Sequence, residues 1–336
     1  MTLLVWRKAA GVVLAAGGAL ALLVWWSFEQ DIGAARARVA LDGTVVQTAC
    51  GPIGYQEKGN GVPLLSVHGS GGGFDQGMAF AGGLAGRGVR VVAMSRYGYL
   101  RTPIPADAQA DAQADAQADA QADAQVCRLD TLGIRTAAVL GGSAGAPSAL
   151  PMAIRHPDRV SGLILLVPLV WMPPDVTVSA PPLPAWVERA MMTAPGSNFR
   201  FRVALQVARN QMIGSVLATP PDLHDSASPS ERARVGTMLD SILPVSARAA
   251  GLRCDPEASR HPTPAPPGTV TAPTLIISAH DDGYGTIASA RHTAGLTPGA
   301  RFVGFAEGGH TFVGHEAEVL AAVLGLLLPD VPSVAS

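Results

Sequence analysis

The sequence predicts an α/β fold built on a doubly wound, mostly parallel sheet, with an inserted helical cap and an N-terminal transmembrane helix. One observation leads to each of these three parts. Short apolar runs that end in Gly, Ser or Pro alternate with helical patterns, as in buried parallel strands joined by crossover helices. The alternation stops between about residues 171 and 250, which predicts an inserted helical cap. A long apolar run near the N-terminus predicts a transmembrane helix. The predicted parts are an anchor at 1–31, a first core segment at 32–170, the cap at 171–250 and a second core segment at 251–336.

The membrane prediction rests on Arg7 and Lys8, which precede an uninterrupted apolar run from Ala9 to Trp26. As a helix, this run would span about 27 Å, close to the hydrocarbon thickness of a bilayer. No small-x-small cleavage site follows it promptly, so we expect an uncleaved anchor. The basic residues keep the N-terminus cytoplasmic, which predicts a catalytic domain on the extracytoplasmic side. A cleaved signal peptide with secretion, or a buried or interfacial helix, is the alternative.

Six strands are expected in the core, joined by helices. The expected strands are 62–67, 89–94, 137–140, 163–167, 274–278 and 301–305. The expected core helices are 76–86, 106–132, 144–156 and 316–328, and the cap has helical patches at 186–192, 199–212 and 230–252. A Pro-rich segment at 261–273 would return the chain to the sheet without regular structure.

One expected helix contains a low-complexity segment in which Ala-Asp-Ala-Gln occurs five times, from Ala106 to Gln125. Ala and Gln favour helix, and a four-residue period places the aspartates in one acidic column. Because like charges at this spacing repel each other, the column is expected on a solvated face as an extension of a crossover helix.

Composition limits the classes of partner. The 336 residues carry a formal net charge of −2, and no Lys/Arg-rich run is interleaved with aromatic residues, so we expect no nucleic-acid partner. Cys50, Cys127 and Cys254 are widely spaced and form neither a disulfide framework nor a CxxC metal site. At most one bridge could form, and we expect three unpaired, partly buried cysteines.

The strongest local motif is Gly-Gly-Ser-Ala-Gly at 141–145, between a predicted strand and a predicted helix. This is the pattern of a nucleophile elbow, a sharp turn that holds the Ser143 hydroxyl above the sheet. The flanking glycines allow the strand and the helix to approach each other without side-chain collision. Ser143 is therefore the candidate nucleophile.

An oxyanion hole requires two N–H donors, one of them from a loop after an earlier strand. His68-Gly-Ser-Gly-Gly-Gly73 has this position, so the amides of Ser70 and Ala144 are the candidates, with Gly71 as an alternative to Ser70. We expect His68 itself to be structural. Neither glycine cluster fits a G-x-G-x-x-G or P-loop nucleotide motif, so no nucleotide cofactor is expected.

A serine hydroxyl needs a base, and the base needs a carboxylate that fixes its tautomer. Asp281 and Asp282 follow one predicted strand, and His310 follows the next, which matches the chain order Ser, acid, His. We favour Asp282 as the acid and keep Asp281 as the alternative. No histidines and carboxylates occur at metal-ligand spacing, so no metal is expected.

With these motifs in this order, the chain from about residue 44 onward resembles the α/β-hydrolase superfamily. The resemblance also includes Ser-Arg-Tyr-Gly-Tyr at 95–99 and Arg-His-Pro-Asp-Arg-Val at 155–160. It is closest to the lipase/esterase-like and C–C hydrolase-like members with a helical cap. In that family the second acidic residue of such a pair usually supplies the triad acid, which supports Asp282. The serine nucleophile points away from the haloalkane dehalogenases.

The sequence thus predicts a membrane-anchored serine hydrolase that acts on a carboxylic ester or related small acyl substrate without a cofactor. C–C bond hydrolysis, cofactor-free perhydrolysis and a non-catalytic membrane-tethered scaffold are the alternatives. The natural substrate and the oligomeric state stay open.

Overall fold

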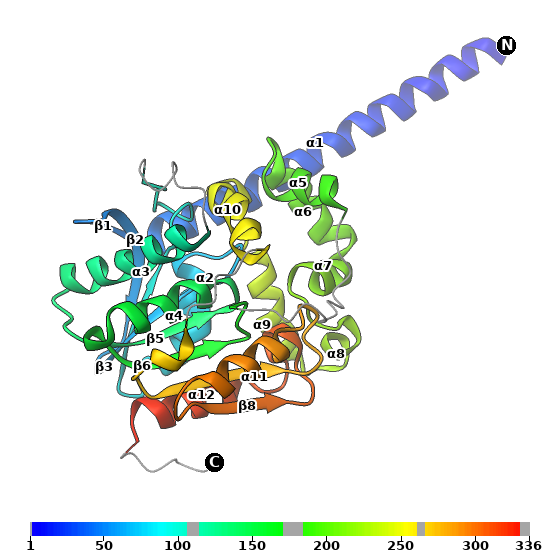
Figure 1. Cartoon of the computed structure of the whole chain (residues 1–336). Helices are drawn as coiled ribbons and strands as arrows, with labels where there is room; N and C mark the ends of the chain where they lie inside the picture. The colour runs from blue at the N-terminus through cyan, green and yellow to red at the C-terminus, as the bar shows by residue number, and fades with distance from the viewer. Residues whose placement is uncertain (1, 106–113, 171–183, 261–265, 330–336) are drawn as a thin grey trace.

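The computed structural model describes residues 2–105, 114–170, 184–260 and 266–329 of the chain. Its centre is an eight-stranded sheet with the order β1-β2-β4-β3-β5-β6-β7-β8 (Figure 1). The pairs β1–β2 and β2–β4 are antiparallel, and all the other neighbours are parallel. The prediction of an α/β fold with a mostly parallel sheet is therefore confirmed.

The predicted strands are present with small changes at their ends. The strands are β1 (Thr44–Thr48), β2 (Gly51–Lys58), β3 (Val62–Val67), β4 (Val89–Met94), β5 (Ala137–Gly142), β6 (Val160–Leu166), β7 (Thr274–Ala279) and β8 (Arg301–Phe305). The hairpin β1–β2 was not predicted. Its outer strand β1 has no buried residue, so it lacks the apolar run that marks the inner strands.

Helices cover both faces of the sheet: α2 (Phe74–Ala81), α3 (Ala114–Thr131), α4 (Ala146–Arg155), α11 (Thr286–Leu296) and α12 (Glu316–Leu327). Successive residues of a strand point to opposite faces, and Leu64 and Leu65 accordingly belong to different core clusters. The cluster of Leu65 includes residues of α3, α4 and α11, and that of Leu64 includes residues of α2 and α12. Two apolar layers thus hold the sheet whose strand ends carry the site.

The segment between β6 and β7 is helical, with α5 (Ala185–Met192), α6 (Ser197–Val207), α7 (Arg209–Val216), α8 (Pro221–Ser226), α9 (Pro229–Asp240) and α10 (Ala249–Arg260). The predicted patch 199–212 is divided between two helices, and 230–252 is divided at Pro244. The predicted start of the cap at 171–183 and residues 261–265 of the Pro-rich segment lie outside the described residues. The helices share an apolar core built around Phe201, Ile213 and Leu239.

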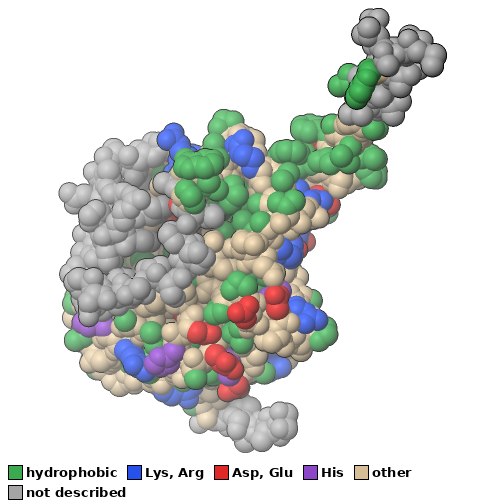
Figure 2. All heavy atoms as spheres, turned by 90° about the vertical axis from the view of Figure 1, so that its right-hand side faces the viewer, with side chains coloured by type: hydrophobic (Ala, Val, Ile, Leu, Met, Phe, Trp, Pro, Cys, Tyr) green, Lys and Arg blue, Asp and Glu red, His purple; other side chains and the backbone are tan. Residues whose placement is uncertain are grey.

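The N-terminal helix α1 (Thr2–Asp42) is continuous and projects from the body (Figure 1). Figure 2 shows hydrophobic side chains along the projecting part. The helix does not end at the predicted boundary of the anchor at residue 31, but continues to Asp42 and buries Phe28, Ile32 and Val39. Within the described part of the chain, no helix is long and apolar enough to cross a membrane. Several side chains at the start of the predicted span, from Ala9 onward, are not among those described. The predicted transmembrane anchor is therefore not supported by the structure.

The expectation of three unpaired cysteines is wrong, because Cys50 and Cys127 form a disulfide that ties the β1–β2 turn to α3. Residues 77 positions apart give no local signal of pairing. Cys254 is free.

Asp119 and Asp123 of the repeat lie on a solvated face, as predicted for the acidic column, whereas other residues of the repeat are packed against the domain. Asp119 and Asp123 are close to half exposed and pair with Arg155 of α4. Gln121 is buried, and its Oε1 accepts the amide hydrogen of Tyr97 (3.0 Å). The first two copies, at 106–113, lie outside the described residues.

The packing of α1 predicts a contrast between its two halves. Ile32 is 1% exposed in the cap cluster, whereas Leu20 is 63% exposed. Ile32→Ala should lower the free energy of unfolding by about 2–4 kcal/mol, the usual cost of truncating a buried aliphatic side chain. Leu20→Ala should change it by less than about 0.5 kcal/mol. Denaturant unfolding of both variants measures the difference, and equal values would show that the inner half of α1 is not packed on the domain.

Candidate active site

The candidate nucleophile Ser143 lies at the turn between β5 and α4. Its φ of 52° is in the left-handed region that residues with a Cβ rarely adopt. A Cβ on Gly145 would lie 2.6 Å from the carbonyl oxygens of both Val67 and His68, and one on Gly141 would lie 2.6 Å from the Ala149 Cβ. Only glycine permits this close packing, which is how the motif fixes the serine in a strained turn.

His310 is held by Asp282 at the neighbouring strand ends. The imidazole Nδ1 lies 2.9 Å from Asp282 Oδ2, and this carboxylate is fully buried. Because Nδ1 faces a carboxylate, it carries the proton, and Nε2 is the basic nitrogen. His310 and Ser143 line the same cavity, whose volume is about 880 Å³.

Asp281 contacts the loop before His310. Its carboxylate accepts the amide hydrogens of Gly308 (3.2 Å) and Gly309 (2.8 Å), the two residues before His310. Of the two aspartates that the sequence left open, the structure thus brings Asp282 to the imidazole and uses Asp281 to hold the loop.

Two residues that sequence reasoning missed complete this side of the site. Thr286 Oγ1 donates a hydrogen bond to Asp282 Oδ2, and the Tyr284 amide donates to Asp282 Oδ1 (3.0 Å). The Tyr284 ring packs edge to face against His310, with centroids 5.1 Å apart. Burial, with a further contribution from the Asp282 charge, raises the pKa of Tyr284 far above its usual value, so its phenol stays neutral. Both residues lie within four positions of Asp282, and proximity to the predicted acid is the signal that could have found them.

The loop after β3 places the candidate oxyanion donors. A Cβ on Gly69 would lie 3.0 Å from the Ser143 Cβ, so this loop passes directly beside the serine. Ser70 lines the cavity. The amide of Gly71 already donates to Tyr99 Oη (3.4 Å), which favours Ser70 over Gly71 as the donor. The amide of Ala144 lies in the first turn of a short helix, where N–H groups have no intrahelical acceptor.

A buried network holds the start of this loop. His68 Nδ1 lies 2.6 Å from Gly69 O, and His68 Nε2 accepts the amide hydrogen of Arg96 (2.9 Å). Burial, and to a smaller extent the Arg96 charge, keeps the pKa of His68 well below its usual value, so the ring is neutral. Its contacts with two backbone groups give it a structural role. Arg96 also donates to the carbonyl oxygens of His68 and Gly69 and makes a two-pronged ion pair with Asp255 of α10 (2.8 and 2.9 Å).

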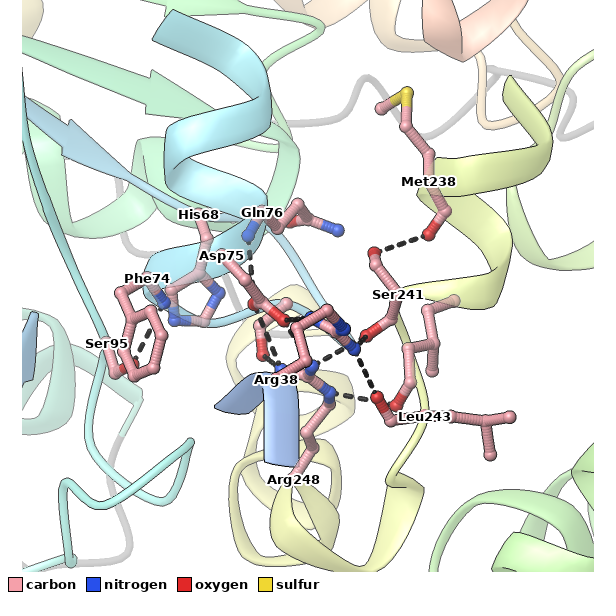
Figure 3. A network of polar contacts seen from close by, with 12 residues as sticks. Arg38, His68, Phe74, Asp75, Gln76, Ser95, Met238, Ser241, Leu243 and Arg248 are labelled. Atoms are coloured by element: carbon pink, nitrogen blue, oxygen red, sulfur yellow. Dashed lines mark hydrogen bonds and ion pairs between the residues drawn. The ribbon is translucent and has the colours of Figure 1, made fainter. Parts of the chain in front are cut away.

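The other side of the loop is held through Asp75, in the first turn of α2 (Figure 3). Its carboxylate accepts hydrogen bonds from Arg38 of α1 (2.6 Å) and from the fully buried Arg248 (2.7 Å). The next residue, Gln76, accepts the amide hydrogen of Gly69 at its Oε1 (2.8 Å). Two cations from distant segments thus meet one carboxylate next to the candidate oxyanion loop.

The cavity is lined by both apolar and charged side chains. Apolar lining residues include Phe80, Leu166, Val167, Leu205, Leu217, Met238 and Leu243. Among the described residues, each arginine of the lining has a carboxylate partner: Arg38 with Asp75, Arg202 with Asp31, Arg209 with Asp240, and Arg234 with Glu231. This lining suits an uncharged acyl group better than an anionic one.

Comparison with protein-family models agrees with this geometry. The model described as the alpha/beta hydrolase fold matches residues 62–316, most of the chain and all the candidate site residues. This chain belongs to the α/β-hydrolase family. The membership shows that this α/β-hydrolase is an enzyme that carries out hydrolysis.

Two curated relatives match part of this α/β-hydrolase. It is 35% identical over 111 residues to a 2-hydroxymuconate semialdehyde hydrolase of Pseudomonas putida and 36% identical over 115 residues to one of Pseudomonas sp. strain CF600. These matches cover 33% of this chain and only 37% and 38% of the relatives.

Solved structures are similar over a longer range. An alpha/beta hydrolase fold protein from Nakamurella multipartita superposes with a TM-score of 0.62 at 24% identity and covers 86% of this chain and 94% of its own. An enol-lactonase from Burkholderia xenovorans LB400 has a TM-score of 0.61 at 17% identity over 84% and 99% of the two chains. At these identities the likeness shows the fold.

The two aspartates offer a matched test of the site. Asp282→Asn keeps the shape of the side chain but removes the charge that fixes His310, so kcat should fall by about 10³- to 10⁴-fold. Asp281→Asn keeps an oxygen that can accept from Gly308 or Gly309, so kcat should fall by less than about tenfold. Steady-state kinetics on a reporter ester measures both, and a larger loss in the Asp281 variant would exchange the two assignments.

Proposed function

We propose that the protein is a serine hydrolase that cleaves a carboxylic ester or a related acyl bond through an acyl-enzyme. The Ser143 hydroxyl attacks the carbonyl carbon as its proton passes to His310 Nε2, and Asp282 stabilises the resulting imidazolium. The amides of Ser70 and Ala144 bind the oxyanion. His310 then protonates the leaving alcohol, and a water molecule activated by the same nitrogen releases the acid.

One observation carries this proposal: a serine in a strained elbow lines the same cavity as an imidazole fixed at its far nitrogen by a buried carboxylate. This combination supplies a nucleophile, a base and a defined tautomer. The oxyanion loop beside the serine supports the same chemistry. A non-catalytic scaffold would have no need for the strain at Ser143 or for the buried Asp282.

The cavity favours an uncharged acyl group. In the described part of the chain, its lining includes many apolar side chains, and its four arginines are matched by five carboxylates, so this lining has no net positive charge for a substrate carboxylate. Neutral esters of moderate chain length are therefore the first substrates to test.

C–C bond hydrolysis is the second candidate, because two relatives are named 2-hydroxymuconate semialdehyde hydrolase. The same serine, histidine and aspartate could attack a ketone carbonyl, with a carbanion as the leaving group. The lining argues against this candidate, since such a substrate carries a carboxylate and the described lining has no net positive charge to bind it. Cofactor-free perhydrolysis uses the same parts, and no observation favours it.

We also propose that α1 holds the enzyme at a membrane, with the catalytic domain on the extracytoplasmic side. The basic residues before an apolar run support this orientation. The exposed Trp25 and Trp26 are of the kind enriched at membrane interfaces. The disulfide between Cys50 and Cys127 suits an oxidising compartment.

The test of function compares the wild-type chain with Ser143→Ala on nitrophenyl esters of two to twelve carbons, on esters with a terminal carboxylate, and on 2-hydroxymuconate semialdehyde. We expect hydrolysis of the neutral esters, at least tenfold lower kcat/KM for the carboxylate-bearing ones, and a loss of several orders of magnitude in the variant. A fluorophosphonate probe should label only the wild-type protein. An unchanged rate of ester hydrolysis in Ser143→Ala would contradict the mechanism. Faster turnover of the semialdehyde than of the esters would favour C–C bond hydrolysis.

The test of membrane attachment compares the full chain with residues 27–336, which keep Phe28, Ile32 and Val39. The full chain should sediment with membranes and resist extraction by high salt and carbonate, and the shortened chain should remain in the supernatant. N-terminal sequencing of the mature protein detects removal of the segment. A full chain found in the supernatant with its N-terminus intact would contradict the proposal.

A further inference from the structure

The inner half of α1 forms part of the wall of the catalytic cavity. Ala34, Ala35 and Arg38 line the same cavity as Ser143 and His310. This half of the helix therefore belongs to the wall of the cavity in which the reaction would occur. The following inference rests on the proposed function for its kinetic part and on contacts alone for its structural part.

Arg38 is the residue through which α1 reaches the site. Its guanidinium donates to Asp75 Oδ2 (2.6 Å) and to the carbonyl oxygens of Ser241 (3.0 Å) and Leu243 (2.6 Å). These carbonyls belong to the turn that follows α9. One side chain thus joins three segments that are remote in sequence: α1, the start of α2 and the end of α9 (Figure 3).

The candidate oxyanion loop is held at one end by α2, which Arg38 contacts, and at the other by Arg248, which shares Asp75 with Arg38. At one end, Gln76 of α2 accepts the amide hydrogen of Gly69 (2.8 Å). At the other, Arg248 donates to the carbonyl oxygen of Gly72 (2.5 Å) and to Asp75. Ser70 lies between these two fixed points, so a shift of α2 or of the turn after α9 would move its amide.

The charges indicate why Arg38 is more than a counterion. Burial works to raise the pKa of Asp75, but Arg248 and then Arg38 outweigh it and hold that pKa below its usual value. The fully buried Arg248 alone supplies one positive charge for this one carboxylate. Arg248 also donates to the carbonyl oxygens of Ser241 (2.6 Å) and Ile242 (2.8 Å). Arg38, whose side chain is 31% exposed, is the second cation, and what it adds is the connection of α1 to Asp75 and to the carbonyl oxygens of Ser241 and Leu243.

We propose that Arg38 is a positioning residue that sets the Ser70 amide for the oxyanion, so that transition-state stabilisation depends on the N-terminal helix. Within the described part of the chain, the hydrogen bonds of Arg38 go to Asp75, Ser241 and Leu243, so Arg38 acts on the site through Asp75, Gln76 and the loop. A displacement of an oxyanion donor by a fraction of an ångström weakens binding of the transition state more than binding of the ester.

The test is Arg38→Ala in the full chain, with the exposed Arg36→Ala on the same helix as the matched control. We expect kcat for a neutral nitrophenyl ester to fall about tenfold or more while KM changes less than threefold, and Arg36→Ala to match the wild type. The Ki of a trifluoromethyl ketone, which forms a tetrahedral oxyanion on the serine, should rise by the same factor as kcat/KM falls. Arg38→Lys, which keeps the charge but fewer donors, should lie between.

Hydrogen exchange of residues 68–77 gives a readout that does not need activity. The amides of this segment should exchange faster in Arg38→Ala than in the wild type or in Arg36→Ala. Unchanged exchange there, or faster exchange with unchanged kcat, would overturn the proposal. If Arg38→Ala does not fold, Arg38→Lys decides by the same two measurements. A wild-type protein that neither hydrolyses esters nor reacts with fluorophosphonate would refute the proposed function, and the exchange result would still decide whether Arg38 holds the loop.

Discussion

The close approach of β5, α4 and the loop after β3 is the constraint on which the site depends. Gly145 packs against the carbonyl oxygens of Val67 and His68 with no room for a side chain. This contact forces Ser143 into its left-handed conformation and at the same time brings Gly69 beside it. The nucleophile and one oxyanion donor are therefore set by a single packing contact rather than by two independent loops. The strain at one residue is sustained because the core on both faces of the sheet holds the strands in place.

Around that contact, the protein places charges where water has little access. Arg96 with Asp255, and Arg248 with Asp75, are buried ion pairs that each link the oxyanion loop to the segment before β7. Burying such pairs costs desolvation energy, which further hydrogen bonds must offset, and here backbone carbonyls of the loop accept them. These pairs define the position of the loop more than they stabilise the fold. His68 serves the same end without a charge, since its neutral ring bridges two backbone groups.

Sequence reasoning worked best where chemistry is local. The inner strands can be recognised as apolar runs, and the glycines around Ser143 indicate the nucleophile elbow directly. Chain order was enough to nominate Asp282 and His310. It could not separate Asp281 from Asp282, because that choice depends on which carboxylate the loop before His310 turns toward.

Contacts between segments that are remote in the chain could not be predicted from the sequence. Arg96 meets Asp255 across 159 residues, and Arg38 meets Leu243 across 205. Neither pair has a spacing that marks it. The helix after Asp31 was missed for a related reason, since its arginines and alanines suit an exposed linker as well as a helix whose buried face is only Phe28, Ile32 and Val39.

The tetrapeptide repeat of α3 has a consequence for how this gene product can vary. Each copy within α3 accounts for about 6 Å of helix, and all five copies have the same residues in the same order. The packed end of α3 places two aspartates against Arg155, a Gln at the Tyr97 amide and two alanines in the core, all at fixed distances from Cys127. If a copy is gained or lost, its neighbour occupies the same place, and the change in length appears at the other end. Slippage of the coding repeat would thus produce length variants of one enzyme that share an unaltered interior.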